Sequence, residues 1–307
     1  MSSSPQPRQT LSYIHDLLRS RGLRPKNKLG QNFLVDLNLL EVVVQSAELT
    51  TDDCVLEVGT GTGALSSRIA DQAGALFTVE LDADFFRLAR SILAVRENVL
   101  QFHGDILERK NEVNPLVLEG WLQLQREKNL NRLKLVANLP YAIATPLIAN
   151  LLIAEVPLER IVVMVQLEVA QRFIATVGTK DYGALAILSQ SVADTEILRK
   201  IPPTAFWPRP KVDSAIIQIR PNAEKRAQVG NILAFRHFLR DLYTQRRKSL
   251  RQALVGWPGG KRDKAHVDAV LAELGISGTE RSEMLDIPTH LRLAAAFAKE
   301  PDQNNAD

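Results

Sequence analysis

The feature that most constrains the fold of this chain is a regular alternation between short apolar segments and segments of helical pattern. The apolar segments have strand length and are nearly continuous runs, which is typical of buried parallel strands. They are Cys54–Val58, Leu76–Val79, Val99–Phe102, Leu133–Ala137 and Ile161–Val165. The helical segments between them are Ala64–Asp71, Asp82–Val95 and Thr145–Ala154. This alternation predicts an α/β fold with a parallel sheet covered on both faces.

The remaining segments complete the sheet and add a second domain. Helices are expected at Thr10–Gly22, Leu37–Ala47 (capped by Asp36), Gln166–Thr176 and Tyr182–Val192, and late strands at Thr195–Lys200 and Ser214–Arg220. From about Val229 the pattern becomes all-helical. A length of 307 residues suggests about two domains. We therefore expect a larger domain at residues 1–222, which includes a basic N-terminal extension, and a smaller all-helical domain at residues 223–307.

The net charge of +3 conceals a strong asymmetry along the chain. Residues 199–262 hold fifteen Lys and Arg against three Asp and Glu, and residues 1–30 hold six against one. The body between them, residues 31–198, is acidic, with thirteen Lys and Arg against twenty-two Asp and Glu. Two basic segments that flank an acidic body indicate a polyanionic partner.

Several classes of protein are excluded or disfavoured. A single cysteine, Cys54, excludes an internal disulfide and a cysteine-rich zinc site, and the five scattered histidines have no ligand spacing, so no metal is expected. The uncharged stretch Leu135–Ala154 has the length of a membrane span. Because Pro140 and Pro146 interrupt it, we reject that interpretation. With no signal peptide apparent at the N-terminus, we expect a cytoplasmic protein and a monomer.

A glycine-rich turn follows the first of the predicted parallel strands, in VLEVGTGTGALS (Val55–Ser66). Gly59 and Gly61 satisfy the spacing of a dinucleotide-binding loop, and Glu80 lies at the end of the next strand, where a carboxylate can hold ribose hydroxyls. Both NAD and S-adenosylmethionine would present an adenosine to such an acid. Glu57 favours S-adenosylmethionine, because a carboxylate there suits an amino group better than a pyrophosphate. Asp105, after the third strand, can accept a hydrogen bond from an adenine amine.

The tetrapeptide Asn138-Leu139-Pro140-Tyr141 follows the fourth strand at the same edge of the sheet. The Asn138 side-chain oxygen and a nearby backbone carbonyl can accept both N–H bonds of an exocyclic base amine and aim its lone pair at a methyl group. Pro140 stiffens the loop, and Tyr141 can stack on the base. Catalysis would then depend on positioning and electrostatics. The alternative is a simple strand-ending turn, since Asn and Pro are turn formers.

With these motifs in place, the sequence resembles the bacterial small-subunit rRNA adenine N6,N6-dimethyltransferases, the KsgA/RsmA group. The resemblance extends over about Lys26–Phe297. It is carried by KLGQNFLVD, LEVGTGTGALS, VELD, GDIL, NLPY, VQLEVAQRF, DYGALAI, AFWPRPKVDSA, QRRKSLRQAL and RSEMLDIPTHLRLA. It implies a Rossmann-like class I methyltransferase domain followed by a small helical rRNA-binding domain. It also implies dimethylation of two adjacent adenines in a hairpin near the 3′ end of 16S rRNA, within an assembling small subunit.

The resemblance also implies roles for individual residues. Asn32 and Leu34 would lie over S-adenosylmethionine, Gly59 would approach its amino-acid part, and Asn138 would lie between the cofactor and the target amine. By the same resemblance Glu80 would hold the ribose and Asp105 the adenine. Phe206 would be the second stacking partner, so that a flipped adenine lies between Phe206 and Tyr141. The alternative is that Phe206 and its neighbour Trp207 close an edge of the core.

Two further expectations concern the surface. The segment from Asp105 to Asn138 is about ten residues longer than is usual in the group and rich in polar residues, so we expect a surface insertion. The second expectation is a basic helix face that contacts rRNA. Four cations lie within about one and a half helical turns with no acid in reach, namely Arg246, Arg247, Lys248 and Arg251. An rRNA contact is also considered for Arg24, Lys26 and Lys28.

Three alternative functions remain at this stage. The first is methylation of 23S rRNA adenine, against which GQNFL and PKVDSA favour the small-subunit group. The second is a mainly non-catalytic assembly factor, against which the intact Glu80, Asp105, Asn138 and Tyr141 argue. An NAD-dependent oxidoreductase is a distant third.

Overall fold

The computed structural model describes residues 9–109, 112–258 and 261–298. The chain divides into two compact units. The first comprises Met1–Ala170 and Glu196–Pro221, and the second Gln171–Thr195 and Asn222–Asp307. From the sequence, residues 171–195 are expected in the first domain. They group instead with the helices that follow Pro221, because their packing partners are there.

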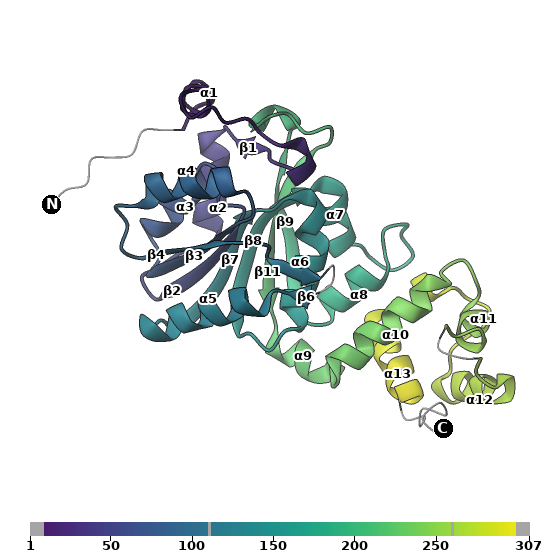
Figure 1. Cartoon of the computed structure of the whole chain (residues 1–307). Coiled ribbons are helices and arrows are strands. Elements are labelled where there is room, and N and C mark those ends of the chain that lie inside the picture. Colours follow the sequence, from purple (N-terminus) through teal and green to yellow (C-terminus); the bar gives the residue numbers. More distant parts are fainter. Residues whose placement is uncertain (1–8, 110–111, 259–260, 299–307) are drawn as a thin grey trace. The chain divides into compact units, whose positions relative to one another are not determined.

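The first unit is built on a seven-stranded sheet, shown in Figure 1. In order across the sheet, the strands are β4 (Val99–His103), β3 (Ala75–Glu80), β2 (Asp53–Val58), β7 (Arg132–Asn138), β8 (Leu158–Gln166), β11 (Ser214–Pro221) and β9 (Ala193–Ile201). The five strands from β4 to β8 are parallel, and β11 runs antiparallel to β8. The predicted parallel sheet is therefore confirmed. Its carboxyl edge lies at the end of β2, where the chain continues into the glycine-rich loop.

Helices cover both faces of this sheet (Figure 1). On one face are α2 (Leu37–Ser46), α3 (Ala64–Ala70) and α4 (Ala83–Leu93), and on the other are α5 (Pro115–Glu127) and α6 (Tyr141–Ile153). Asp36 caps α2 as predicted, because its carboxylate accepts from the backbone N–H groups of Asn38 and Leu39. Helix α6 begins at Tyr141, four residues earlier than expected, so the loop after β7 contains only Leu139 and Pro140. Helix α7 (Leu167–Phe173) follows β8 directly.

The segment between Asp105 and Asn138, which was expected to form a surface insertion, is largely part of the fold. The segment contains a short hairpin, β5 (Leu107–Arg109) with β6 (Glu112–Val113), and then α5. Val117, Trp121 and Leu124 recur on one face of α5 and are buried, and the Trp121 indole N–H donates to the Cys54 carbonyl at 3.2 Å. Some of the polar residues that suggested an insertion lie in the exposed hairpin, and the others occupy the outer face of a helix that covers the sheet.

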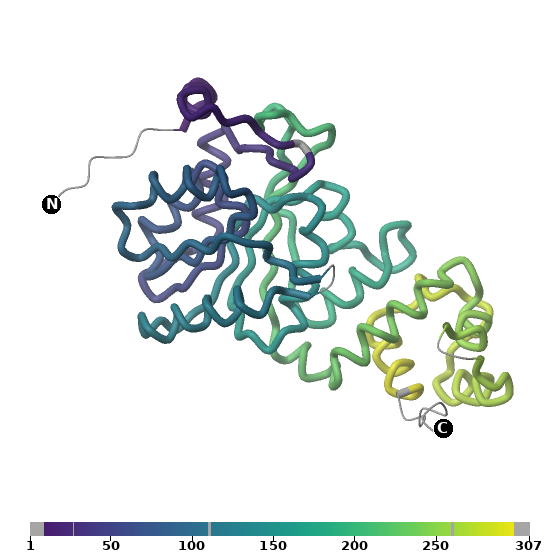
Figure 2. The backbone as a smooth tube through the Cα atoms, in the orientation of Figure 1, coloured from purple at the N-terminus to yellow at the C-terminus, as the bar shows by residue number. Residues whose placement is uncertain are grey.

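A small N-terminal structure lies over the carboxyl edge of the sheet. Helix α1 (Leu11–Ser20) precedes a 3₁₀ turn at Asn27–Leu29 and the short strand β1 (Phe33–Leu34), which pairs with β10 (Phe206–Trp207). A second 3₁₀ turn, Pro203–Ala205, leads into β10. Figure 2 shows this purple N-terminal segment beside the green segment that contains β10. The antiparallel pairing therefore joins parts of the chain more than 170 residues apart.

The second unit is helical. It contains α8 (Ala184–Gln190), α9 (Ala223–Val229), α10 (Ile232–Thr244), α11 (Leu250–Val255), α12 (Lys264–Leu274), a 3₁₀ turn at Ser282–Met284 and α13 (Ile287–Ala298). The buried Tyr182 ties the 171–195 segment to the rest, because its hydroxyl donates to the Leu285 carbonyl at 3.1 Å. Among the described residues, no helix combines the length and the apolar character that crossing a membrane requires.

Candidate active site

A cavity of about 470 Å³ opens at the carboxyl ends of the parallel strands of the first unit. In open α/β sheets this edge is where ligands bind. The cavity is lined by the loop before β1, the turns after β2, β3 and β4, and the loop after β7. Every residue that was predicted to bind the cofactor lines it, namely Asn32, Leu34, Gly59, Gly61, Glu80, Asp105 and Asn138. Leu139, Pro140 and Tyr141 line it as well.

The glycine-rich loop needs its glycines for both conformation and space. Gly59 and Gly61 have φ of +86° and +55°, the left-handed region that L side chains rarely adopt. A Cβ at Gly61 would also lie 3.1 Å from the Phe33 ring, so the loop and β1 are in close contact. The Gly61 N–H donates to Glu80 Oε2 at 2.9 Å. The loop is therefore fixed against both neighbouring elements.

Glu80 is held in place by backbone groups. Its Oε2 accepts from the Gly61 N–H and its Oε1 accepts from the Asp82 N–H, each at 2.9 Å. The side chain is buried, which raises the pKa of the carboxyl against the opposing effect of those two hydrogen bonds. Each carboxylate oxygen has a further lone pair. Glu80 can therefore accept two more hydrogen bonds, such as those of vicinal ribose hydroxyls.

Glu57 does not have the environment that the sequence analysis assumed. The side chain is 1% exposed, and its Oε2 accepts from the hydroxyls of Ser66 at 2.6 Å and Thr78 at 2.7 Å. The Thr78 hydroxyl also contacts that of Thr60 at 2.6 Å. Burial raises the pKa of Glu57 to about 8, so the group is mostly protonated at neutral pH. Its Oε2 serves the inner structure of the loop. The residue also lines the cavity, but as a mostly neutral group rather than the charge that was expected beside a bound amino group.

Asp105 stands at the end of the turn after β4. Its Oδ1 accepts from the Leu107 N–H at 2.9 Å, and its carbonyl accepts from the Asn114 side chain at 3.0 Å. Asn114 also caps α5, so the turn is anchored to that helix. Because Asp105 is exposed and its second carboxylate oxygen is available, it can accept a hydrogen bond from a ligand amine.

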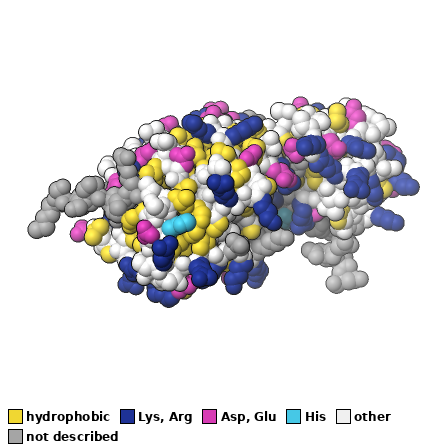
Figure 3. Space-filling view, turned by 90° about the horizontal axis from the view of Figure 1, so that it is seen from above, with side chains coloured by type: hydrophobic (Ala, Val, Ile, Leu, Met, Phe, Trp, Pro, Cys, Tyr) yellow, Lys and Arg dark blue, Asp and Glu magenta, His cyan; other side chains and the backbone are white. Residues whose placement is uncertain are grey.

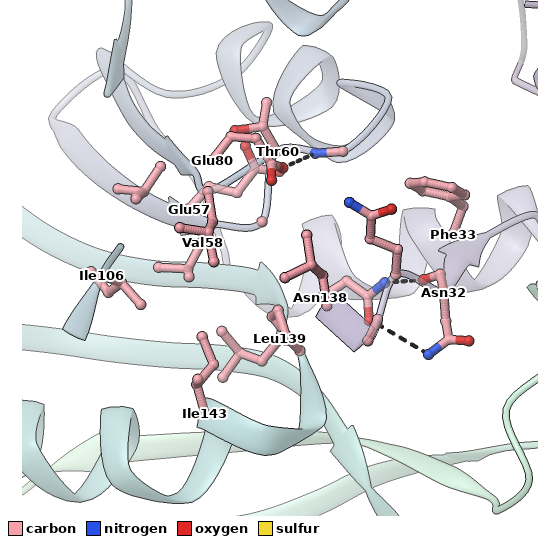
Figure 4. Close-up of a pocket in the computed structure, with 18 of the residues that line it drawn as sticks. Asn32, Phe33, Glu57, Val58, Thr60, Glu80, Ile106, Asn138, Leu139 and Ile143 are labelled. Atoms are coloured by element: carbon pink, nitrogen blue, oxygen red, sulfur yellow. Dashed lines mark hydrogen bonds between the residues drawn. The ribbon is translucent and has the colours of Figure 1, made fainter. Parts of the chain in front are cut away.

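Asn138 is oriented by the loop above it. Its side-chain amide nitrogen donates to the Asn32 backbone carbonyl at 2.9 Å, a bond drawn in Figure 4, while the Asn32 side chain donates to the Gly30 carbonyl at 3.2 Å. The amide N–H is therefore committed to the GQNFL loop. This bond fixes which way the side chain points and presents Oδ1, an acceptor, on its other side. The next residue, Leu139, is tied to β8 through its N–H and the Met164 carbonyl at 3.2 Å.

The loop that carries Asn32 is fastened on both sides. Lys26 Nζ lies 2.9 Å from Asp82 Oδ2 and 3.0 Å from Asp84 Oδ2, and the Gln31 amide donates to Asp82 at 3.1 Å. These bonds raise the pKa of Lys26 and lower that of Asp82. Lys26 therefore has a structural partner, and the rRNA contact considered for it is not supported. Toward the interior, a Cβ on Gly30 would meet Pro140 at 3.8 Å.

Tyr141 begins α6 at the mouth of the cavity. Its hydroxyl lies 2.6 Å from the Ser214 Oγ. Burial raises the pKa of the Tyr141 phenol, so it remains protonated at physiological pH. The side chain is partly exposed, which leaves ring surface toward the cavity. Sequence reasoning included Ser214 in the motif PKVDSA but gave it no role.

The stacking role expected of Phe206 does not agree with its position. The ring is 2% exposed and belongs to an apolar cluster with Leu34, Leu40 and Ala205. It is buried because β10 pairs with β1, which places Phe206 opposite Leu34. Trp207 packs against α1, with its ring 4.3 Å from that of His15. Phe206 therefore offers no free face to a base in this structure, and the alternative interpretation, in which Phe206 and Trp207 close an edge of the core, agrees with both positions.

The basic cluster of the second unit is smaller than predicted. Helix α10 ends at Thr244, so the four residues do not share one helix. Arg251 pairs with Asp268 and Arg246 with Glu283, which contradicts the expected absence of acids. Arg247 and Lys248 are exposed. Two of the four cations are therefore paired with acids, so the local charge is lower than the sequence implied. Figure 3 shows Lys and Arg side chains on the visible face of the molecule with Asp and Glu side chains among them.

Two apolar residues of the cavity were not singled out from the sequence. Leu81 and Ile106 each follow directly after a predicted cofactor-binding acid, Glu80 and Asp105, and both line the cavity. Leu81 is 49% exposed despite its apolar side chain. A pair of apolar residues beside two carboxylates suits the faces of a flat, polar-edged ligand such as a nucleoside base. Their position immediately after the acids was the available signal.

The sheet order, the glycine-rich turn after β2 and the acid at the end of β3 define a Rossmann-like methyltransferase of class I. Comparison with known proteins places the chain more narrowly. A family model described as ribosomal RNA adenine dimethylase matches residues 22–292. The chain belongs to this family of enzymes.

Individual relatives agree with this assignment. The chain is 38% identical over 290 residues to the "Ribosomal RNA small subunit methyltransferase A" of Lachnoclostridium phytofermentans, covering 94% of this chain and 95% of that one. It is 36% identical over 284 residues to the protein of the same name from Geobacillus kaustophilus, covering 92% and 94%. Among solved structures, a dimethyladenosine transferase from Plasmodium falciparum has the same fold, with a TM-score of 0.70, 24% identity and coverage of 86% and 96%.

Proposed function

We propose that this enzyme transfers methyl groups from S-adenosylmethionine to the N6 amines of two adjacent adenines in a hairpin near the 3′ end of 16S rRNA. It would act on the assembling small subunit in the cytoplasm. The observation that carries the proposal is the orientation of Asn138, whose amide donates to Asn32 and whose Oδ1 is presented at the cavity. The substrate is inferred from relatives named small subunit methyltransferase A.

The donors and acceptors around the cavity fit S-adenosylmethionine. Glu80 would accept the ribose hydroxyls, Asp105 the adenine amine, and Leu81 and Ile106 would contact the adenine faces. Gly59 and Gly61 leave room for the amino-acid part, and Asn32 and Leu34 would cover it. When bound, the cofactor supplies a methyl group on a sulfonium centre. Asn138 would lie next to this methyl group. The methyl acceptor would enter on the side of Tyr141, which follows Asn138 by three residues.

The residues after β7 would activate the acceptor amine. The lone pair of an adenine N6 is delocalised into the ring, which makes the nitrogen a poor nucleophile. Asn138 Oδ1 and the backbone carbonyl of Leu139 would accept its two N–H bonds, shift it toward tetrahedral geometry and direct the lone pair at the methyl group. The methylated ammonium loses its proton readily, so no strong general base is required. The enzyme would thus act by positioning and electrostatics.

Tyr141 would hold the flipped base by stacking. A base stacked on an aromatic side chain gains roughly 1–3 kcal/mol, which helps to offset the cost of unstacking it from its helix. In this structure Phe206 is buried, so the proposal assigns the stacking contact to Tyr141 alone.

The test uses purified small and large ribosomal subunits from cells that lack these adenine methylations. Each is incubated with the protein and labelled S-adenosylmethionine, and modified bases are mapped by mass spectrometry. Label in two adjacent adenines near the 3′ end of 16S rRNA supports the proposal. Label only in 23S rRNA would refute the choice of subunit, and no transfer to either would refute the activity.

A further inference from the structure

The hydrogen bond between Tyr141 and Ser214 links the proposed base-stacking residue to the sheet. The two hydroxyl oxygens are 2.6 Å apart, a normal O–H···O distance. Ser214 is completely buried, although it lies only two residues after the exposed Val212. A buried hydroxyl is costly unless it is paired, so this contact accounts for the burial of a polar side chain beside the cavity.

Ser214 is a rigid anchor. It is the first residue of β11 and lies opposite Gln166 in the antiparallel pairing with β8. The residue before it is fixed as well, because the Asp213 carbonyl accepts from the Leu167 N–H at 2.9 Å. The backbone on both sides of Ser214 is therefore held by the sheet. Its side chain has only the rotation about χ1 with which to move.

Tyr141, in contrast, begins a helix and follows a two-residue loop. Pro140 restricts the backbone before it, but the aromatic ring still has two side-chain torsions. A hydrogen bond at the far end of the ring restricts χ1, because it holds the phenol oxygen in place. That oxygen lies on the axis of χ2, so the tilt of the ring is restrained only through the preference of the hydroxyl hydrogen and lone pairs for the ring plane. The direction in which the ring points is then set by two different elements, the start of α6 and the start of β11.

We propose that Ser214 is a positioning residue, which holds the ring of Tyr141 in the orientation that the target adenine stacks against. The inference rests on the proposed function, because it takes Tyr141 as the stacking residue. Ser214 itself makes no contact with the base in this proposal. It acts only through the Tyr141 hydroxyl.

The test is a double-mutant cycle on methyl transfer to undermethylated small subunits at saturating S-adenosylmethionine. Ser214→Ala and Tyr141→Phe each remove one partner of the hydrogen bond and leave the ring. Each should lower the turnover rate about three- to tenfold, the effect of one ordinary hydrogen bond. The double variant should be no slower than the slower single variant, because the second change removes nothing further.

Three controls separate positioning from loss of structure. Equilibrium binding of S-adenosylmethionine should be unchanged in both single variants, since neither residue is placed at the cofactor. Ser214→Thr retains the hydroxyl and should recover most of the turnover lost in Ser214→Ala. Ser189→Ala removes another buried serine hydroxyl, one bonded to the Ala186 carbonyl within α8, and should leave turnover at the wild-type rate.

The outcomes distinguish this inference from the proposed function. If the losses of the two single variants multiply in the double variant, Ser214 acts independently of Tyr141 and the inference is wrong. Wild-type turnover in Tyr141→Phe would refute it equally. If the wild-type protein itself transfers no methyl group to any rRNA, the proposed function fails and the inference falls with it.

Discussion

The two ends of strand β7 differ in how their polar groups are used. At its beginning, the buried Lys134 donates to the carbonyls of Ala47 and Glu48 and to Asp53 Oδ2, at 3.1, 2.8 and 3.1 Å. All three ammonium protons are thereby used. At its end, Asn138 donates its amide to Asn32 and presents Oδ1 at a cavity. The comparison teaches that a polar group whose hydrogen bonds are all made within the protein stabilises the fold. A polar group with one atom left unbonded can use that atom to bind a substrate.

The largest effect is expected at the end of β7, at Asn138. Asn138→Ala removes an acceptor that would stabilise the reacting amine, and such losses lower turnover about 10²- to 10³-fold. Stability should change little, because the Asn32 carbonyl lies at a cavity that water can enter. The measurement is single-turnover methyl transfer to small subunits, with subunit binding measured in parallel. Turnover within a few fold of wild type would show that Asn138 is a strand-ending turn residue only.

At the beginning of β7, a substitution should lower stability and leave activity unchanged. Lys134→Met leaves Asp53, which is fully buried, without its closest ammonium and should lower the free energy of unfolding by about 3 kcal/mol. Arg132 also pairs with Asp53, at 3.1 Å, and limits the loss. Methyl transfer per folded molecule should stay near the wild-type rate. Chemical denaturation together with the transfer assay tests this, and a variant of normal stability but low activity would overturn the comparison.

The third prediction concerns Glu57 in the wall of the cavity, whose titration should affect the stability of the fold. Its pKa of about 8 lies above the ordinary value of 4.5, so the folded state binds a proton that the unfolded state releases. The contribution to stability is therefore complete below about pH 4.5 and is lost as the pH rises toward 8, at about 1.4 kcal/mol for each pKa unit.

The matching variant is Glu57→Gln, a neutral side chain of the same shape. It should reduce the decline in unfolding free energy between pH 5 and pH 8, although Glu80, whose pKa is also raised, keeps part of it. Denaturation curves at several pH values provide the measurement. An identical pH slope in both proteins would mean that Glu57 is ionised in the folded protein.

The smallest effect is expected from the ion pairs of Lys26, which hold the loop that orients Asn138. Lys26→Met removes the contacts with Asp82 and Asp84, but the Gln31 bond to Asp82 remains. We expect affinity for S-adenosylmethionine to fall only two- to threefold, because partly exposed ion pairs contribute little. Isothermal titration measures it, with the exposed Arg24→Met as the matched control. Equal affinities in the Lys26 and Arg24 variants would remove the fastening role.

The sequence was sufficient for local features. The strands β2, β3, β4, β7 and β8 were predicted because continuous apolar runs are visible along the chain, and Asp36 was predicted as a cap because capping is local. Glu80, Asp105 and Asn138 were predicted because the carboxyl ends of parallel strands must meet. Asn32 and Leu34 were predicted only through the resemblance to the family. Helix α5 was missed because its apolar stripe is diluted by polar residues on the other face.

Contacts between distant segments were beyond the reach of sequence reasoning. Phe206 was expected to be accessible, and only the pairing of β10 with β1 shows why it is buried. Glu57 was expected to be charged, because the sequence does not reveal that the folded chain buries its carboxyl almost completely. Arg251 was expected to lack an acid, because Asp268 is on another helix. In each case the neighbouring atoms come from segments that local pattern does not connect.

The most direct test of the central claim is the identity of the modified atom. Small subunits methylated by the protein are digested to nucleosides, and the products are separated and fragmented by mass spectrometry. If Asn138 Oδ1 directs an exocyclic amine, the product is N6,N6-dimethyladenosine, with both methyl groups on one nitrogen. Methyl groups on a ring nitrogen, a ribose hydroxyl or another base would contradict the claim.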